Sequence, residues 1–118
     1  MVDGSPFSVK LPNRYGATIP PAKLTRYLLA DTHPVGGHKA AVFRAVGFNE
    51  KNVALLREEL LRIARVEDVT ESLPCECGVK YVIDAEINTP QSTHMELRTV
   101  WIIEHGEENP RLVTAYPL

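Results

Sequence analysis

The spacing of hydrophobic residues changes from helical to strand-like near residue 66, and this change constrains the fold more than any other feature of the sequence. Before it, one stretch has the three-to-four-residue spacing of an amphipathic helix. The residues of that stripe are Val53, Leu56, Leu60, Ile63 and Ala64. After it, residues 79–87 alternate apolar and polar side chains, as in a strand with one buried face. We therefore expect helices first and a sheet afterwards.

Three helices are predicted in the first half of the chain. The first covers about residues 22–30 and follows two prolines, which are common at helix starts. The second covers about residues 37–46 and ends at Gly47, a residue that readily caps a helix C-terminus. The third follows a capping Asn49, with Glu50 in its first turn next to the positive end of the helix dipole.

Four strands are predicted in the second half, separated by connections too short for parallel crossovers. They cover residues 66–73, 79–87, 97–104 and 111–116. The predicted fold class is α+β, with about three N-terminal helices followed by a four-stranded antiparallel sheet and the helices packed on one sheet face. Residues 1–15 are expected to form a loose N-terminal lead-in, and residues 16–118 a single domain.

Composition excludes several classes of protein. The formal net charge is −2 and the sequence pI is near 6.1, which argues against non-specific binding to duplex DNA. No run of about 18 apolar residues is present, and the N-terminus lacks the apolar segment of a secretory signal. We expect a cytoplasmic protein that associates with neither membrane nor DNA.

The cysteines do not have the spacing of a metal site. Cys75 and Cys77 are two residues apart, and the four histidines form none of the paired motifs typical of zinc sites. We interpret the two cysteines as reduced thiols whose side chains point to opposite sides of a strand. No metal and no cofactor are expected.

Several side chains with suitable chemistry are expected to border the open sheet face. His38 and Lys39 lie at the start of the second predicted helix, and histidine exchanges protons near neutral pH. Arg98 lies in the third predicted strand and offers the planar fork that binds phosphate oxygens. Thr114 and Tyr116 are two apart in the last strand, so their hydroxyls project from one face.

Structural explanations exist for the same residues. His38 could be solvated, or could form a hydrogen bond with Tyr116 between helix and sheet. Arg98 could pair with a cross-strand acid such as Glu86. Strict alternation leaves open whether Arg98 shares a face with Thr114, and Arg111 or Lys80 could take its place.

Three segments of the chain resemble one family. The segments LPNRYGATIPPAKLTRYLLADTHPVGGHKAAVFRAVGF, VKYVIDAEI and LRTVWIIEHGEENPRLVTAYPL are similar to an uncharacterised family of small bacterial domains with an HP-G-HKA and PRL-T-Y signature. The resemblance covers about residues 9–118. That family in turn resembles the C-terminal domains of polymorphic and contact-dependent toxins of the barnase/EndoU/colicin/RelE-like ribonuclease superfamily.

The resemblance implies a metal-independent, toxin-like ribonuclease that cleaves single-stranded RNA or tRNA and is controlled by a cognate antitoxin or immunity protein. The implied catalytic residues are His38, Arg98, Thr114 and Tyr116, and the implied phosphate- or RNA-binding residues are Lys39, Arg111 and Lys80. The alternative is a non-catalytic anion- or protein-binding module of a toxin–antitoxin-like pair. In that case the N-terminus of the second helix would hold an anion or a partner peptide.

Overall fold

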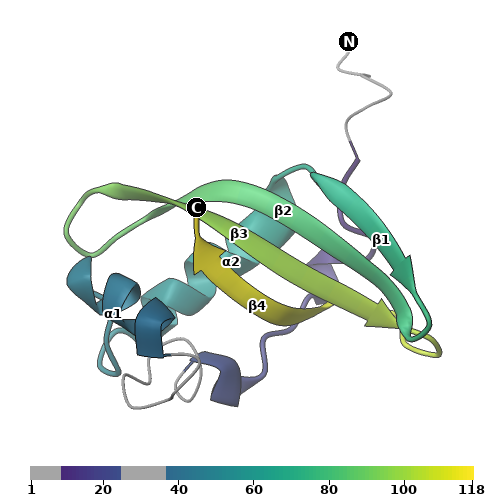
Figure 1. Ribbon diagram of the computed structural model, residues 1–118, viewed down its shortest axis with the longest axis horizontal. Helices are drawn as coiled ribbons and strands as arrows, with labels where there is room; N and C mark the ends of the chain where they lie inside the picture. Colours follow the sequence, from purple (N-terminus) through teal and green to yellow (C-terminus); the bar gives the residue numbers. More distant parts are fainter. Residues whose placement is uncertain (1–8, 25–36) are drawn as a thin grey trace, which may run out of the picture.

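The computed structural model describes residues 9–24 and 37–118, and for residues 37–40 it describes the backbone alone. A short 3-10 helix is followed by two α-helices and four strands (Figure 1). The elements are η1 (Arg14–Gly16), α1 (Gly37–Ala45), α2 (Val53–Val66), β1 (Glu71–Cys75), β2 (Gly78–Asn88), β3 (His94–Glu104) and β4 (Arg111–Pro117).

The strands form one antiparallel sheet in the order β1-β2-β3-β4, which confirms the predicted α+β class and the predicted sheet. β1 begins five residues later than expected, at Glu71. The reason is tertiary: the amide of Val69 donates to the carbonyl of Val9, and Asp68 bridges to Lys10. Residues just before β1 thus pair with the N-terminal segment instead of extending the strand.

The helices differ in number from the prediction. Two α-helices are present among the described residues, where three helices were expected. The helix predicted over residues 22–30 starts with a helical turn at residues 21–24, and residues 25–36 lie outside the described part of the chain. No helix in the described part is long and apolar enough to cross a membrane.

The start of α2 corrects the predicted cap. Asn52, and not Asn49, occupies the N-cap position, and Asn49 forms the turn before it. The side chain of Asn52 ties this turn together: Oδ1 accepts from the Asn49 amide at 2.8 Å, and Nδ2 donates to the Gly47 carbonyl at 2.9 Å. Glu50 precedes the N-cap and so lies outside the first turn of α2, where it pairs with Arg44 of α1.

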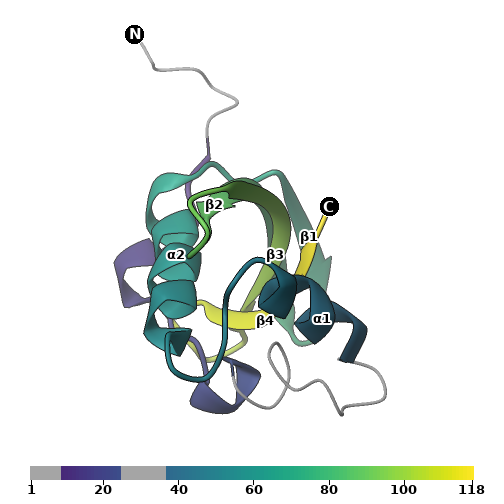
Figure 2. The ribbon, with the colours of Figure 1, turned by 90° about the vertical axis from the view of Figure 1, so that its left-hand side faces the viewer.

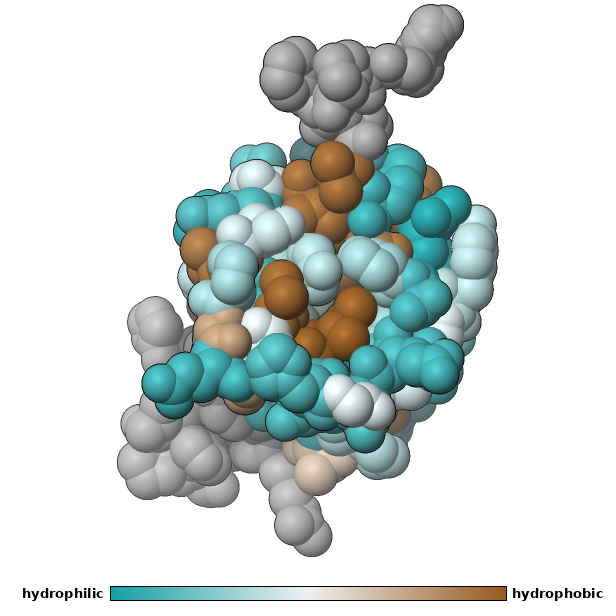
Figure 3. Space-filling model, turned by 90° about the vertical axis from the view of Figure 1, so that its right-hand side faces the viewer, coloured by the Kyte–Doolittle hydropathy of each residue, from teal (hydrophilic) through white to brown (hydrophobic). Residues whose placement is uncertain are grey.

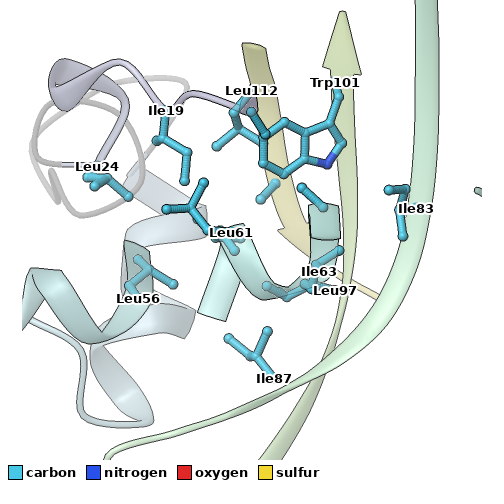
Figure 4. Close-up of a cluster of buried hydrophobic side chains, with 14 of the residues drawn as sticks. Ile19, Leu24, Leu56, Leu61, Ile63, Ile83, Ile87, Leu97, Trp101 and Leu112 are labelled. Carbon is cyan, nitrogen blue, oxygen red and sulfur yellow. The ribbon is translucent and has the colours of Figure 1, made fainter. Parts of the chain in front are cut away.

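The core lies between α2 and one face of the sheet (Figure 4). The predicted helical stripe is confirmed, because Leu56, Leu60 and Ile63 are fully buried. The sheet contributes the predicted alternating side chains of β2 and their neighbours on β3 and β4. These are Ile83, Ile87, Leu97, Trp101, Leu112 and Ala115. Burial of large aliphatic and aromatic side chains supplies most of the stability of a domain of this size.

One polar chain of hydrogen bonds crosses this core. The indole Nε1 of Trp101 donates to Thr99 Oγ1 at 2.9 Å, and that hydroxyl donates to the Ile83 carbonyl at 2.9 Å. Both side chains are fully buried. Buried polar groups need such partners, so Thr99 allows the indole to lie inside the core.

The N-terminal segment packs against the sheet. Leu11 is fully buried, and the backbone of Thr18 bonds to Pro110 and Leu112 beside β4. Part of the stretch expected to be a loose lead-in therefore contributes to the core. The domain boundary at residue 16 stays a prediction.

Candidate functional site

The site residues predicted on β3 and β4 lie together on the sheet face opposite the core. A β-bulge between Val100 and Trp101 makes Val113 an extra residue on β4. Beyond the bulge, Arg98 lies directly opposite Tyr116 and Val100 opposite Thr114. Residues directly opposite each other in an antiparallel pair share a face. The bulge therefore settles the question that strict alternation left open: Arg98, Thr114 and Tyr116 share a face.

The adjacent strands β2, β3 and β4 contribute one residue each to a row across this face, here called the Asp84–Arg98–Tyr116 row. Arg98 donates from Nε to Asp84 Oδ1 at 2.8 Å and from Nη2 to Asp84 Oδ2 at 2.9 Å. Such a two-point contact fixes the plane of the guanidinium. The pair is partly exposed, with 39% of the Arg98 side chain and 26% of the Asp84 side chain accessible.

The neighbours in the Asp84–Arg98–Tyr116 row shift the pKa values of Asp84 and Arg98. The hydrogen bond from Arg98 lowers the pKa of the Asp84 carboxyl, and burial opposes this only in part. The Asp84 carboxylate, followed by the Tyr116 hydroxyl, raises the pKa of Arg98. Arg98 is therefore a permanent cation that contacts groups on both neighbouring strands. Its ion-pair partner is Asp84, and not the Glu86 that the sequence suggested.

A second pair of charges lies further along the same face. Arg111 forms an ion pair with Glu104, and both side chains are 43% exposed. The pair borders a pocket of about 170 Å³. The pocket is lined by Thr18, Ile102, Glu104, Glu107, Asn109 and Arg111. Lys80 lies in the same row as Ile102 and Arg111, so all three predicted sheet cations share the open face.

His38 and Lys39 belong to the first turn of α1, and their side chains lie outside the described part of the structure. The helix itself contacts β4. Figure 2 shows α1 in front of β4 near the C-terminus of the chain, on the other side of the view from α2. The contact brings α1 next to the strand that carries Thr114 and Tyr116, and the positions of the imidazole and the ammonium group stay predictions.

The face has the parts needed to hold a phosphate group. Arg98 supplies a fixed charge, and the hydroxyls of Thr114 and Tyr116 lie on adjacent positions of the same face. Cationic and hydroxyl donors arranged in this way can stabilise charge that develops on phosphate oxygens. A phosphate would share Arg98 with Asp84, which already engages Nε and Nη2.

Asp84 was not predicted as a member of the site. The alternation of β2 placed Asp84 and Glu86 on one face, but only the register shows that Asp84 is directly opposite Arg98 and that Glu86 is opposite Glu96. A signal was present, because an acid and an arginine in neighbouring strands commonly pair. The choice between the two acids required the register.

The cysteines correct another expectation. Their side chains point toward each other and not to opposite sides, with 2.8 Å between the Sγ atoms. Residues two apart in a strand share a face, and Cys77 already lies in the β1–β2 turn. Among the described residues, no three or more His, Cys, Asp and Glu side chains cluster as metal ligands.

These features define a small α+β domain with an antiparallel four-stranded sheet whose outer face carries paired charges and hydroxyls. The chain belongs to the family described as Domain of unknown function (DUF6883), which matches residues 10–118. No curated protein matches the sequence.

A solved structure has a similar fold. A chain of the contact-dependent growth inhibition toxin–immunity protein complex from Klebsiella pneumoniae 342 superposes with a TM-score of 0.67. The sequence identity is 11%, and the match covers 85% of this chain and 98% of that chain. At this identity the likeness concerns the fold.

Proposed function

We propose that this protein is a toxin-like, metal-independent ribonuclease that is held inactive by a cognate immunity protein. The observation that carries the proposal is the shared open face of Arg98, Thr114 and Tyr116. The fold shared with a chain of a toxin–immunity complex adds support, as does the contact between α1 and β4. The expected substrate is single-stranded RNA or the loops of tRNA, because their bases and 2′-hydroxyls are exposed.

The proposed reaction uses the 2′-hydroxyl of the RNA as nucleophile. His38 would accept its proton while the 2′-oxygen attacks the adjacent phosphorus and the bond from phosphorus to the 5′-oxygen breaks. The leaving 5′-oxygen takes up a proton, and the product is a 2′,3′-cyclic phosphate. Arg98 and the two hydroxyls would stabilise the additional negative charge on the phosphate oxygens. Lys39, Lys80 and Arg111 would bind neighbouring phosphates.

The ion pairs on the open face support a second candidate, a surface that binds another protein. Arg98 and Arg111 each form an ion pair with an acid on the same face, through Asp84 and Glu104. Paired charges of this kind are also typical of polar surfaces that recognise another protein. A non-catalytic protein-binding module is therefore the second candidate.

The decisive experiment is RNA cleavage by the purified protein in the presence of EDTA. We expect cleavage of single-stranded or tRNA substrates that leaves 2′,3′-cyclic phosphate ends. His38→Ala should lower the rate by at least ~10², the usual contribution of a proton-transfer group.

His105→Ala is the matched control, since His105 is exposed in the turn after β3 and is not a proposed site residue. It should cleave at the wild-type rate, and both variants should retain the wild-type thermal unfolding midpoint. Full activity of His38→Ala, or loss of all cleavage in EDTA, would reject the mechanism, and absence of cleavage by the wild type with or without EDTA would favour the binding module.

A further inference from the structure

The tip of the β1–β2 hairpin carries two thiols in contact. Cys75 is the last residue of β1, and Cys77 is the second residue of the two-residue turn that leads into β2. Their Sγ atoms are 2.8 Å apart. Cys75 is half-buried and Cys77 is exposed, so reagents in solution can reach the pair.

The backbone holds the two thiols in this arrangement. Cys75 lies opposite Gly78 in the strand register, which closes the hairpin around Glu76 and Cys77. The carbonyl of Cys77 accepts from the His105 amide at 2.9 Å, which ties the turn to the end of β3. Gly78 has a φ of 149°, and a Cβ there would lie 2.1 Å from the Ile103 carbonyl oxygen. The tip is therefore a defined turn and the thiols do not meet by chance contact of loose ends.

The two thiols are chemically unequal. The hydrogen bond from Cys77 lowers the pKa of Cys75, and the charge of Lys80 contributes in the same direction. The same contact raises the pKa of Cys77. Because the thiolate is the reactive form, Cys75 is the expected nucleophile and Cys77 the partner that reacts second.

We propose that Cys75 and Cys77 form a redox site that closes to an intramolecular disulfide by exchange with small-molecule disulfides. The Cys75 thiolate attacks one sulfur of the disulfide, a mixed disulfide forms on Cys75, and one thiolate leaves. The Cys77 thiol loses its proton to solvent and attacks the Cys75 sulfur, which releases the second thiolate. The protein dithiol is oxidised by two electrons, and the small disulfide is reduced to two thiols.

The site lies at one end of the open face. Cys75, Gly78 and Glu104 lie opposite one another in a row across the sheet. On the same face, the next row contains Lys80 and Arg111. The β1–β2 turn and the β3–β4 loop share the end of the molecule seen in Figure 3, where hydrophobic patches lie in the middle and toward the top among hydrophilic residues. Oxidation would fix the turn that borders this face, independently of what the face binds.

The test uses the full chain, first reduced and then freed of reductant. The protein is incubated with oxidised glutathione near neutral pH, and the remaining thiols are alkylated and counted by intact-mass spectrometry. We expect the treated protein to accept no alkyl group and to lose the mass of two hydrogen atoms, whereas untreated protein accepts two alkyl groups. Added dithiothreitol should restore both thiols.

Single substitutions separate the two steps. Cys77→Ser should retain glutathione as a stable mixed disulfide on Cys75, and Cys75→Ser should react several-fold more slowly. Lys80→Gln, made in a protein that keeps both cysteines, should slow the attack of Cys75 on oxidised glutathione without preventing formation of the intramolecular disulfide. Wild-type protein that retains bound glutathione, that forms disulfide-linked dimers, or that keeps both thiols would overturn the proposal.

Discussion

The guanidinium of Arg98 is fixed by a neighbouring strand before any ligand arrives. The guanidinium donates two hydrogen bonds to the Asp84 carboxylate, and these bonds lower the pKa of Asp84. A residue prearranged in this way loses less freedom when it binds a phosphate. Asp84 acts through Arg98 in this scheme and is a positioning residue.

Replacing Asp84 by Asn should flatten the acid side of the stability profile. A carboxyl whose pKa is lowered in the folded state stabilises the fold above its unfolded pKa of about 3.9, and this contribution is lost as the pH falls through the lower folded value. Wild-type unfolding midpoints should therefore fall more steeply than those of Asp84→Asn below about pH 4. Glu107→Gln, an exposed change in the β3–β4 loop, serves as the control and should follow the wild-type curve. Identical curves for all three proteins would contradict the assignment.

Thr99→Val should destabilise the protein although the two side chains have the same shape. The change leaves the Trp101 indole N–H and the Ile83 carbonyl without the hydroxyl that bonds to both. An unsatisfied buried polar group costs about 1–3 kcal/mol. Urea unfolding should show this loss, and the matched change at exposed Thr18 should have little effect. Equal stabilities would mean that the indole finds another partner.

The two glycines Gly78 and Gly106, each at a hairpin turn, form a matched pair for substitution. Gly78 and Gly106 both have positive φ, at 149° and 85°, but only Gly78 has a neighbouring atom in the way of a Cβ. Gly106→Ala should therefore cost about 1 kcal/mol, from backbone strain alone. Gly78→Ala should cost about 1–3 kcal/mol more, because the methyl group would push β2 from the Ile103 carbonyl. Equal losses in urea unfolding would show that β3 moves aside freely.

Elements with a strong periodic pattern were predictable from the sequence, and their ends were not. The stripe of α2 and the alternation of β2 follow from local spacing alone. The start of α2 at Val53 depends on how the Asn52 side chain folds the preceding turn, and the start of β1 depends on pairing between Val9 and Val69. The first contact is a local bond between a side chain and the backbone, and the second joins residues distant in sequence, so hydrophobic periodicity reports neither of them.

The candidate site, too, was predictable only where it depends on local spacing. The shared face of Thr114 and Tyr116 follows from their spacing of two. That Arg98 joins them depends on the bulge, and that Asp84 holds Arg98 depends on the register of β2 with β3. Neither feature has a signature in this sequence.

On the scale of the whole molecule, the proposed function requires a partner that covers the open face. Because Lys80, Arg98 and Arg111 share that face, the partner should present carboxylates to it. Lys80→Glu should weaken the complex about tenfold, which corresponds to about 1.4 kcal/mol, and should slow association. The measurement is titration of the purified partner, recovered by co-expression with the protein encoded next to this one.

Lys51→Glu is the control for this experiment, because it makes the same charge change at an exposed position before α2. It should bind as the wild type does. Equal weakening by both substitutions would show that only net charge matters. Recovery of no partner in stoichiometric amount, together with harmless expression of the protein alone, would contradict the requirement itself.

The extra residue in β4 also determines which changes of length the chain can tolerate. Val113 separates the part of β4 that begins with Arg111 and Leu112 from the part that holds Thr114, Ala115 and Tyr116. Deleting Val113 would remove the bulge and leave Leu112 and Thr114 as neighbours opposite Trp101 and Val100, so both parts of the strand would keep their faces. The strand could therefore lose this one residue without exchanging core and surface side chains, whereas deleting Ala115, which lies opposite Thr99, would bring Tyr116 to the core face.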